Sequence, residues 1–465
     1  MPTDLKQKFT NFFNGYLFPL YVALNVILGH VFGIVHYSVL LIIAATCVGF
    51  ILCNDLKFFI SPLLSFYFIF SKEILNSEDL YSTSSLIFFG MCIFALISCV
   101  IVHFIIYKKE IKVTRFYSSY LFWGFIALTS FLLLNGFFNF AEYNKENIIF
   151  GTLIAVSIVL PFFIFSINMK IDKKTAKYLV YVLLVISFLI ATELIALYIT
   201  SVKIIDGKIL KQTIDLGWGV SNNVGGILAM LMPVHFYCAL KAKYSLPFFV
   251  SGVGCYVLIL LSMSRTSIII STFILMICMG FLCIYKHKNS MINRFSVIGF
   301  LFLAAVALIF FEDKLDRAFE EIIKIGLDDS GRIEYYKDGI NKFLQRPIFG
   351  VGFGNSHGVN DKFVIAAPEF FHNTVIQMLA SCGILGFSAY AFHRYQTVKL
   401  FISHRTPLSF FLGMSVLTLL LTSLLDIHMF NIFPAMFYSV ILCVLERDGK
   451  YWHQKALSQD LHTLH

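Results

Sequence analysis

Apolar positions in this chain gather into long runs that short polar connections separate. A helix needs roughly 18 or more apolar residues to cross a bilayer, and many of these runs reach that length. Only helices or closed barrels satisfy every backbone polar group in lipid. We therefore predict an all-α polytopic membrane helical bundle of about 12–14 spans. The expected spans are 16–35, 37–53, 57–71, 84–107, 117–139, 147–169, 177–200, 222–240, 247–263, 266–285, 293–311, 372–393, 406–425 and 429–446.

The composition supports this class. Hydrophobic residues make up 58% of the chain and charged residues 14%, whereas soluble domains average about 45–50% and 25%. Mean hydropathy is +0.81. The ten cysteines all fall in the apolar runs and form no CxxC pair, so we interpret them as small buried hydrophobes rather than as disulfide or metal ligands. We predict no metal site and no cofactor.

Lysine and arginine gather in one set of connections, which lies on a single side of the membrane when the spans are counted in order. These connections are 108–115, 170–177, 241–243, 286–294 and 394–405. Cytoplasmic loops carry such an excess, so we expect this side, with both termini, to be the cytoplasm. The net charge of +9 then reflects membrane topology. A nucleic-acid footprint is disfavoured because the charges are scattered over short loops.

The opposite connections include one long polar segment, 312–371, within what we expect to be a single integral membrane domain over 1–465. This extracytoplasmic loop is predicted to hold two amphipathic helices. The first, over 312–325, has apolar residues at helical spacing and charges on its other face. The second begins near Ser330 and ends at Arg346-Pro347. Its predicted apolar stripe comprises Ile333, Tyr336, Ile340, Phe343 and Leu344.

Glycines follow this second helix in the stretch PIFGVGFGNSHG, at 347–358. They allow tight turns and a close backbone approach. The GVGFG portion superficially resembles a phosphate-binding loop, but the strand and helix that such a loop requires are missing. We therefore predict no nucleotide site there.

Several short motifs lie on the same side of the predicted bundle. The stretch FFHNTVIQMLASCGILGF, at 370–387, opens a span with a His-Asn pair and carries two glycines three apart. The motifs are His372-Asn373 with Gly383 and Gly386, Ser264-Arg265-Thr266, Gly331-Arg332 with Tyr335-Tyr336, Pro347 to Gly354, and Gly217-Trp218-Gly219 with Asn222-Asn223. In this order, over roughly 215–390, the set resembles the bacterial O-antigen ligase and O-antigen polymerase superfamily.

That resemblance implies a membrane glycosyltransferase. Members of the superfamily act outside the cytoplasmic membrane on sugars carried by a polyprenyl diphosphate. The implied donor is a glycan on undecaprenyl diphosphate, and the implied acceptor is a hydroxyl of lipid A core or of a growing polysaccharide. The implied partners are these substrates and membrane lipids, without nucleic acid. Ligase and polymerase differ mainly in the acceptor, and both stay open.

The substrate chemistry then suggests roles for three residues. A departing diphosphate gains negative charge, and arginine can bind phosphate oxygens bidentately without losing its own charge. Arg265 and Arg332 are the expected diphosphate ligands, against the alternatives of an interface anchor and a solvated loop charge. His372 is the expected general base for the acceptor hydroxyl. The alternative for His372 is a polar residue that closes a helix end.

Other polar residues are candidates for sugar or acceptor binding. Trp218 would stack on a sugar or lie at the interface, Asn373 would bond substrate or a neighbouring helix, and Glu193 would bind sugar or serve structure. Asp426 and His428 are candidates for support of the site, with a purely structural role as the alternative.

The competing functional class is a transporter or flippase for a polyprenyl-linked glycan. A transporter places its charges near the bilayer midplane. The notable charges of this chain cluster at one face instead, which favours the enzyme.

Overall fold

The chain folds as a helical bundle in the computed structural model, which describes residues 3–70, 82–136, 145–170, 172–205, 208–310, 332–355, 371–426 and 428–463. The N-terminal half contains α1 (Thr3–Phe13), α2 (Leu17–Phe32), α3 (Val35–Leu52), η1 (Leu56–Phe59), α4 (Ile60–Ser65), η2 (Phe66–Ile69), α6 (Thr83–Ile106), α7 (Thr114–Tyr117), α8 (Phe122–Leu133), α9 (Lys145–Asn168) and α10 (Lys173–Thr200). The remainder contains β1 (Ile204–Ile205), β2 (Lys208–Ile209), η3 (Lys211–Thr213), α11 (Ser221–Lys241), α12 (Leu246–Leu261), α13 (Arg265–Ile284), α14 (Ser290–Phe310), α16 (Arg332–Gln345), η4 (Phe353–Asn355), α17 (Thr374–Ser403), α18 (Pro407–Thr422), η5 (His428–Phe430) and α19 (Ile432–Thr463).

Within these residues, seven helices are long and apolar enough to cross a membrane. The bent pair of α1 and α2 adds an eighth, and five shorter apolar helices accompany them. The strands form one two-residue antiparallel hairpin, in which Ile204 pairs with Ile209. The predicted class, an all-α polytopic membrane bundle, is therefore confirmed.

The predicted span at 57–71 is not one straight helix. Leu56–Ile69 forms successive 3₁₀, α and 3₁₀ segments around Pro62. The Leu56 N–H donates to Asn168 Oδ1 at 3.1 Å, while the Tyr67 hydroxyl, at the other end, donates to the Trp218 carbonyl. Irregular backbone is tolerated at membrane depth only where protein covers it. Most of this segment is buried accordingly.

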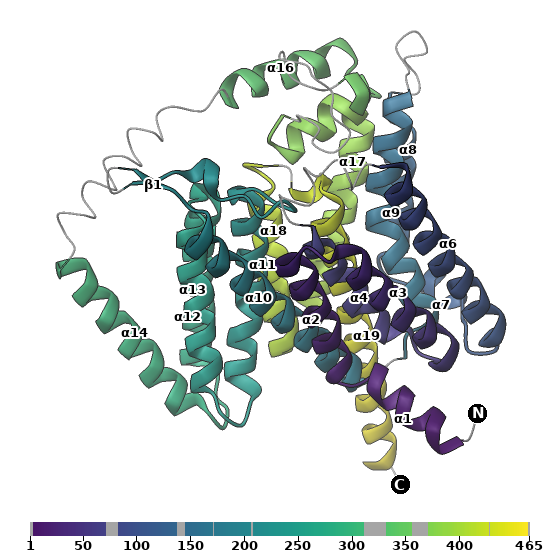
Figure 1. The fold of residues 1–465 in the computed structure, drawn as a ribbon, viewed down its shortest axis with the longest axis horizontal. Coiled ribbons are helices and arrows are strands. Elements are labelled where there is room, and N and C mark those ends of the chain that lie inside the picture. Colours follow the sequence, from purple (N-terminus) through teal and green to yellow (C-terminus); the bar gives the residue numbers. More distant parts are fainter. Residues whose placement is uncertain are drawn as a thin grey trace.

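The two sets of connections lie at opposite ends of the bundle. Contacts join neighbouring basic connections, as where Asn289 Nδ2 donates to the Ala242 carbonyl at 2.6 Å. Figure 1 shows α1 and the C-terminal part of α19 at one end of the molecule and α16 at the other. Four of the five motifs noted in the sequence lie at the starts of helices, namely α11, α13, α16 and α17.

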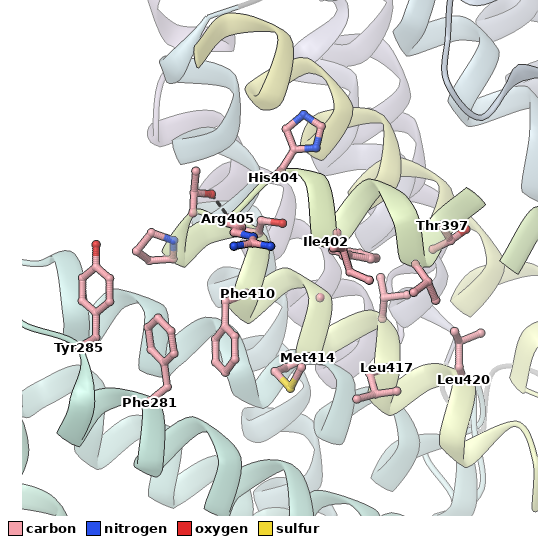
Figure 2. A pocket seen from close by; sticks show the side chains of 17 residues that line it. Phe281, Tyr285, Thr397, Ile402, His404, Arg405, Phe410, Met414, Leu417 and Leu420 are labelled. Atoms are coloured by element: carbon pink, nitrogen blue, oxygen red, sulfur yellow. Dashed lines mark hydrogen bonds between the residues drawn. The ribbon is translucent and has the colours of Figure 1, made fainter. Parts of the chain in front are cut away.

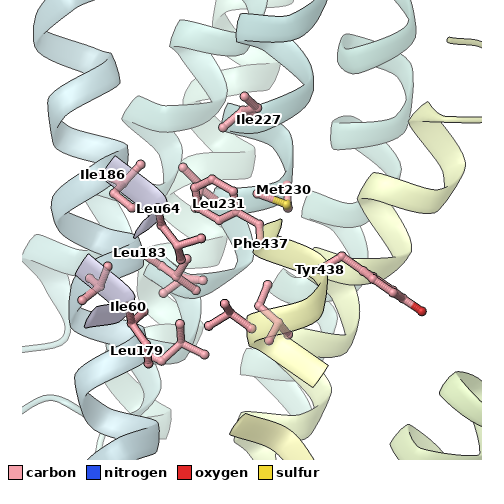
Figure 3. Close-up of a cluster of buried hydrophobic side chains, with 14 of the residues drawn as sticks. Ile60, Leu64, Leu179, Leu183, Ile186, Ile227, Met230, Leu231, Phe437 and Tyr438 are labelled. Atoms are coloured by element: carbon pink, nitrogen blue, oxygen red, sulfur yellow. The ribbon is translucent and has the colours of Figure 1, made fainter. Parts of the chain in front are cut away.

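The core lies around α11, because 89% of the residues in an 18-residue apolar stretch of this helix are buried. A cluster of aliphatic and aromatic side chains joins α4, α10, α11 and α19 there (Figure 3). Ile60 and Leu64 come from α4, Leu183 from α10, Leu231 from α11 and Phe437 from α19. This cluster fixes the central helices whose ends carry the polar residues described below.

A break in α17 receives the glycine-rich segment that follows α16. At Gly383 the backbone leaves helical geometry, with φ 66° and ψ −168°. The Ile384 N–H donates to the Pro347 carbonyl at 2.8 Å, and the Val351 N–H donates to the Ala380 carbonyl at 2.8 Å. The glycines of this segment therefore admit backbone-to-backbone contact inside the bundle, which gives the GVGFG stretch a structural use.

The helix α16 occupies the place of the second predicted loop helix. Gly339 is its buried residue, and a Cβ built there would lie 2.4 Å from Ile376 Cγ2. The predicted stripe is divided, since Ile333, Ile340 and Leu344 are exposed. The contact with α17 is made around Gly339 instead, because glycine allows the closest approach. The first predicted helix, 312–325, lies outside the described residues.

Substituting Gly383→Ala should destabilise the protein. This combination of φ and ψ is essentially restricted to glycine, and strained backbone costs about 1–3 kcal/mol. A Cβ would also lie 2.3 Å from the Ile348 carbonyl oxygen. We expect a lower thermal unfolding temperature in detergent. Gly254→Ala in α12 is the matched control, because its Cβ meets nothing within 4 Å. An unfolding temperature for Gly383→Ala equal to that of the control would contradict the role given to the break.

Candidate functional site

His372 stands immediately before the first turn of α17, in a strained conformation. Its φ is 49°, in the left-handed region that non-glycine residues seldom adopt. The Nδ1 atom lies 3.3 Å from Asp426 Oδ1, and the ring meets Tyr335 of α16 edge to face with centroids 5.7 Å apart. The side chain is 37% exposed. His372 is thus oriented by two neighbours and still accessible to a ligand.

Asp426 connects His372 to a second polar group. Its Oδ2 atom accepts a hydrogen bond from Asn222 Nδ2 at 3.3 Å, and Asn222 Oδ1 accepts one from Lys211 Nζ at 3.1 Å. The four side chains come from η3, from the start of α11, from the turn after α18 and from the start of α17. A continuous polar chain therefore runs from Lys211 to His372.

Three cations gather around this chain. Burial lowers the pKa of Lys211, and the nearby positive charges of Arg265 and Arg332 lower it further, while the Asp426 carboxylate opposes them. Both arginines therefore lie within electrostatic reach of Lys211, although they start different helices, α13 and α16. Such a gathering of cations favours an anion that carries more than one negative charge.

Arg265 owes its position to a strained turn and a glycine. Met263, two residues earlier, has φ 56°. The turn then reaches Ser264, which lies against α11 so closely that a Cβ on Gly225 would be 2.9 Å from Ser264 Cβ. A larger residue at position 225 would push this turn, and Arg265 with it, away from α11.

His428 lies against the neighbouring glycine of α11. A Cβ on Gly226 would be 2.8 Å from His428 Nε2. The side chain is 3% exposed, and burial lowers the pKa of His428 while the Asp426 charge opposes that effect. The close contact holds the turn that carries Asp426 against α11.

Asn373 serves as the N-cap of α17. Its Oδ1 accepts from the Val375 and Ile376 N–H groups at 2.9 and 3.1 Å, and its Nδ2 donates to the Leu424 carbonyl at 2.8 Å. Both ends of the Asn373 side-chain amide are therefore engaged in hydrogen bonds that fix the start of α17 beside His372. The geometry favours positioning over sugar binding for this residue.

Trp218 and Glu193 contact each other. The Trp218 indole donates to Glu193 Oε2 at 2.8 Å, and Glu193 Oε1 lies 3.7 Å from His30 Nδ1. Trp218 is 2% exposed, and its ring meets Phe68 edge to face with centroids 4.7 Å apart. Stacking on a sugar needs an open ring face, so this packing favours a structural role for both residues.

The sequence motifs did not include Lys211, Gly225 or Gly226. Lys211 lies in a connection with several other lysines, and nothing in its neighbours distinguishes it. The Gly225-Gly226 pair lies directly after Asn222-Asn223 and was a usable signal, because paired glycines in a buried helix indicate close packing. Among the residues that the structure describes, no three His, Cys, Asp or Glu side chains are grouped as metal ligands.

Comparison with known families agrees with the motifs. Residues 249–391 match the family model described as O-antigen ligase. This segment includes Arg265, Arg332 and His372. The predicted resemblance to the O-antigen ligase and polymerase superfamily is therefore confirmed. No curated protein matches the chain.

Lys211→Gln should weaken the binding of inorganic pyrophosphate to the purified protein by roughly 10–100-fold at neutral pH, the range expected for one charge-assisted hydrogen bond. Lys211 has a pKa below its ordinary value of 10.5. Wild-type affinity should therefore fall as the pH rises through that lowered value, because the charged form is lost. Lys211→Arg should keep its affinity to higher pH, since arginine stays protonated.

Isothermal titration calorimetry at several pH values measures both effects. Lys203→Gln is the control, because it removes an exposed lysine from the same connection. Equal affinities for wild type and Lys211→Gln would exclude Lys211 from the anion site.

Proposed function

We propose that the chain is a membrane glycosyltransferase of the O-antigen ligase type. It would transfer a glycan from undecaprenyl diphosphate to an acceptor hydroxyl, on lipid A core or on a growing polysaccharide, in the biosynthesis of lipopolysaccharide in the cell envelope. The observation that carries this proposal is the convergence of His372, Asp426 and three cations at one end of the bundle. The family match over residues 249–391 supports it independently.

Arg265, Arg332 and Lys211 bind the donor diphosphate in this proposal. Their positive charges favour the entry of an anion, and the leaving diphosphate gains further charge as its bond to the sugar breaks. Cations that interact more strongly with this developing charge lower the barrier to transfer. Three cations supply such stabilisation without a divalent cation, so we propose a metal-independent reaction.

His372 takes the proton of the acceptor in this proposal. With its proton on Nδ1, the imidazole donates a hydrogen bond to Asp426 Oδ1, and Nε2 is left as the basic nitrogen. The acceptor oxygen attacks the anomeric carbon of the donor sugar while its proton passes to Nε2. The bond between that carbon and the diphosphate oxygen breaks, and its electron pair leaves with the diphosphate. Asp426 holds the ring and stabilises the resulting imidazolium.

We further propose that this end of the bundle faces the outside of a bacterial cytoplasmic (inner) membrane, with both termini in the cytoplasm. The basic connections gather at the opposite end, as cytoplasmic loops do. A polyprenyl tail would remain in lipid while its diphosphate meets an acceptor from the aqueous side.

A repeat-unit polymerase of the same superfamily is the second candidate. It would use the same base and cations with a different acceptor. Glycan analysis of a deletion strain separates the two activities, because loss of a ligase removes all long chains from the lipid core, whereas loss of a polymerase leaves single repeats on it. A transporter or flippase is less favoured, because the gathered charges lie at one end rather than at mid-depth.

Arg265→Ala should abolish transfer from a defined polyprenyl-diphosphate donor, and Arg265→Lys should restore little, because lysine lacks the planar fork. Transfer is measured with purified protein in the presence of EDTA. Arg294→Lys is the control, since Arg294 donates to the Cys283 carbonyl at the opposite end of the bundle. Full activity of Arg265→Ala would remove this residue from the site. Wild-type activity that requires added magnesium or manganese would contradict the metal-independent mechanism.

His372→Gln should reduce transfer by roughly 10²–10⁴-fold, the usual contribution of a general base. Glutamine can bond the acceptor hydroxyl but cannot take its proton. Donor binding should persist, because the cations remain. If His372 only closes a helix end, the hydrogen bond is worth about 0.5–1.5 kcal/mol and glutamine should replace it.

Transfer by purified, folded His372→Gln therefore distinguishes a general base from a residue that only closes a helix end. His287→Gln, in the connection 286–294 at the other end of the bundle, is the control. Turnover near that of wild type would leave this proposal without its base.

A further inference from the structure

A cavity lies at the end of the bundle away from His372. It has a volume of about 550 Å³ and lies between α13, α17 and α18 (Figure 2). On α17 its lining begins at Thr397, 25 residues after His372 and beyond the break at Gly383. The cavity is therefore distinct from the candidate site, although it uses the same helices.

The walls of this cavity are almost entirely apolar. Phe281 of α13 stacks on Phe410 of α18 with centroids 4.0 Å apart, and Met414, Leu417 and Leu420 continue the wall along α18 (Figure 2). From Pro407 to Leu420 this wall is about 20 Å long. One leaflet of hydrocarbon is about 15 Å thick. The cavity, called the slot below, therefore has room for one extended acyl chain along its length.

The slot is accessible from the membrane. Val398 and Ile402, which line it from α17, are 52% and 61% exposed. A lipid can therefore enter sideways without unfolding the helix pair. A water-soluble ligand would have to leave water for an apolar slot, which is unfavourable.

The mouth of the slot is polar and positive. Arg405, His404 and Thr406 come from the turn between α17 and α18, and Tyr285 lies across from them after α13 (Figure 2). Arg405 is exposed. Lys241 adds a second cation, 5.9 Å from the centre of the Tyr285 ring. Basic pockets between membrane helices of this kind suit anionic head groups.

One buried polar atom also faces this region without a partner. The Oγ atom of Ser409, a lining residue that is 3% exposed, has no hydrogen-bond partner within the described part of the chain. Buried hydroxyls are nearly always hydrogen-bonded. An ester oxygen of a lipid that enters from the mouth would supply the missing partner.

We propose that this slot binds an anionic glycerophospholipid, with one acyl chain along α18 and the phosphate at Arg405. The apolar length selects an acyl chain, and the positive mouth selects an anionic head group over a zwitterionic one. A polyprenyl diphosphate bound for transfer would instead carry its head group at the other end of α17. The proposal therefore stands whether or not the chain is a glycosyltransferase.

Native mass spectrometry of delipidated protein tests this proposal with phosphatidylglycerol and phosphatidylcholine of identical acyl chains. Wild type should bind phosphatidylglycerol at least about 10-fold more tightly, a difference that corresponds to one charge-assisted contact. Met414→Trp should fill the slot and weaken both lipids. Arg405→Gln should remove the preference and leave phosphatidylcholine binding unchanged.

Two control variants match these changes elsewhere. Val250→Trp adds the same bulk on the lipid-facing side of α12, where Val250 is 59% exposed. Lys288→Gln removes an exposed charge from a neighbouring connection. Gel filtration and thermal unfolding establish that each variant is folded.

Three results would overturn the proposal. Equal affinity of wild type for the two lipids would exclude a head-group site, and equal losses in the control variants would show bulk lipid contact only. Displacement of phosphatidylglycerol by undecaprenyl phosphate, with the same sensitivity to Met414→Trp, would assign the slot to a polyprenyl chain instead.

Discussion

The break in α17 at Gly383 controls the geometry of the polar end of the bundle. In lipid an unpaired backbone group costs several kcal/mol, so a helix can open there only if other groups bond to the freed backbone. The segment from Pro347 to Gly352 does so through paired N–H and carbonyl groups. Because α16 ends just before that segment, the same contact fixes α16, and with it Arg332 and Tyr335, relative to His372. A single backbone insertion thus aligns the charge and the imidazole that the proposed reaction needs.

Electrostatic repulsion is the complementary constraint. Lys211, Arg265 and Arg332 come from three separate elements, and the lowered pKa of Lys211 reflects their proximity as well as burial. Cations held this close repel one another, and they keep their positions because the surrounding helices are fixed by packing around α11. The strained backbone at Met263 and His372 has the same origin, since strain persists only where the surrounding fold imposes it. The polar end of the bundle is therefore preorganised for a polyvalent anion.

Local sequence patterns predicted where the helices lie better than they predicted the contacts between them. The runs that became α6, α10 and α13 were recognisable because apolar length alone identifies a span. The segment 57–71 misled, because a buried irregular segment has the composition of a helix and owes its conformation to distant partners such as Asn168 and Trp218. Asn373 and Trp218 were predicted as candidates for sugar or acceptor binding, while their hydrogen bonds favour structural roles. Lys211 escaped notice because its distinction is spatial: it is the lysine that a folded loop brings to Asn222.

The helices α17 and α18 join two environments with opposite requirements. At one end their termini hold His372 and Asp426 in a polar cluster, and at the other they line an apolar slot with a basic mouth. The break at Gly383 divides α17 between these tasks, because Thr374–Cys382 lies before it and the slot-lining residues Thr397–Ile402 lie after it. The part before the break is held by the inserted backbone and by the Asn373 cap. A lipid in the slot would therefore contact only the part of α17 after the break. The orientation of His372 depends on residues before the break, which the lipid does not contact.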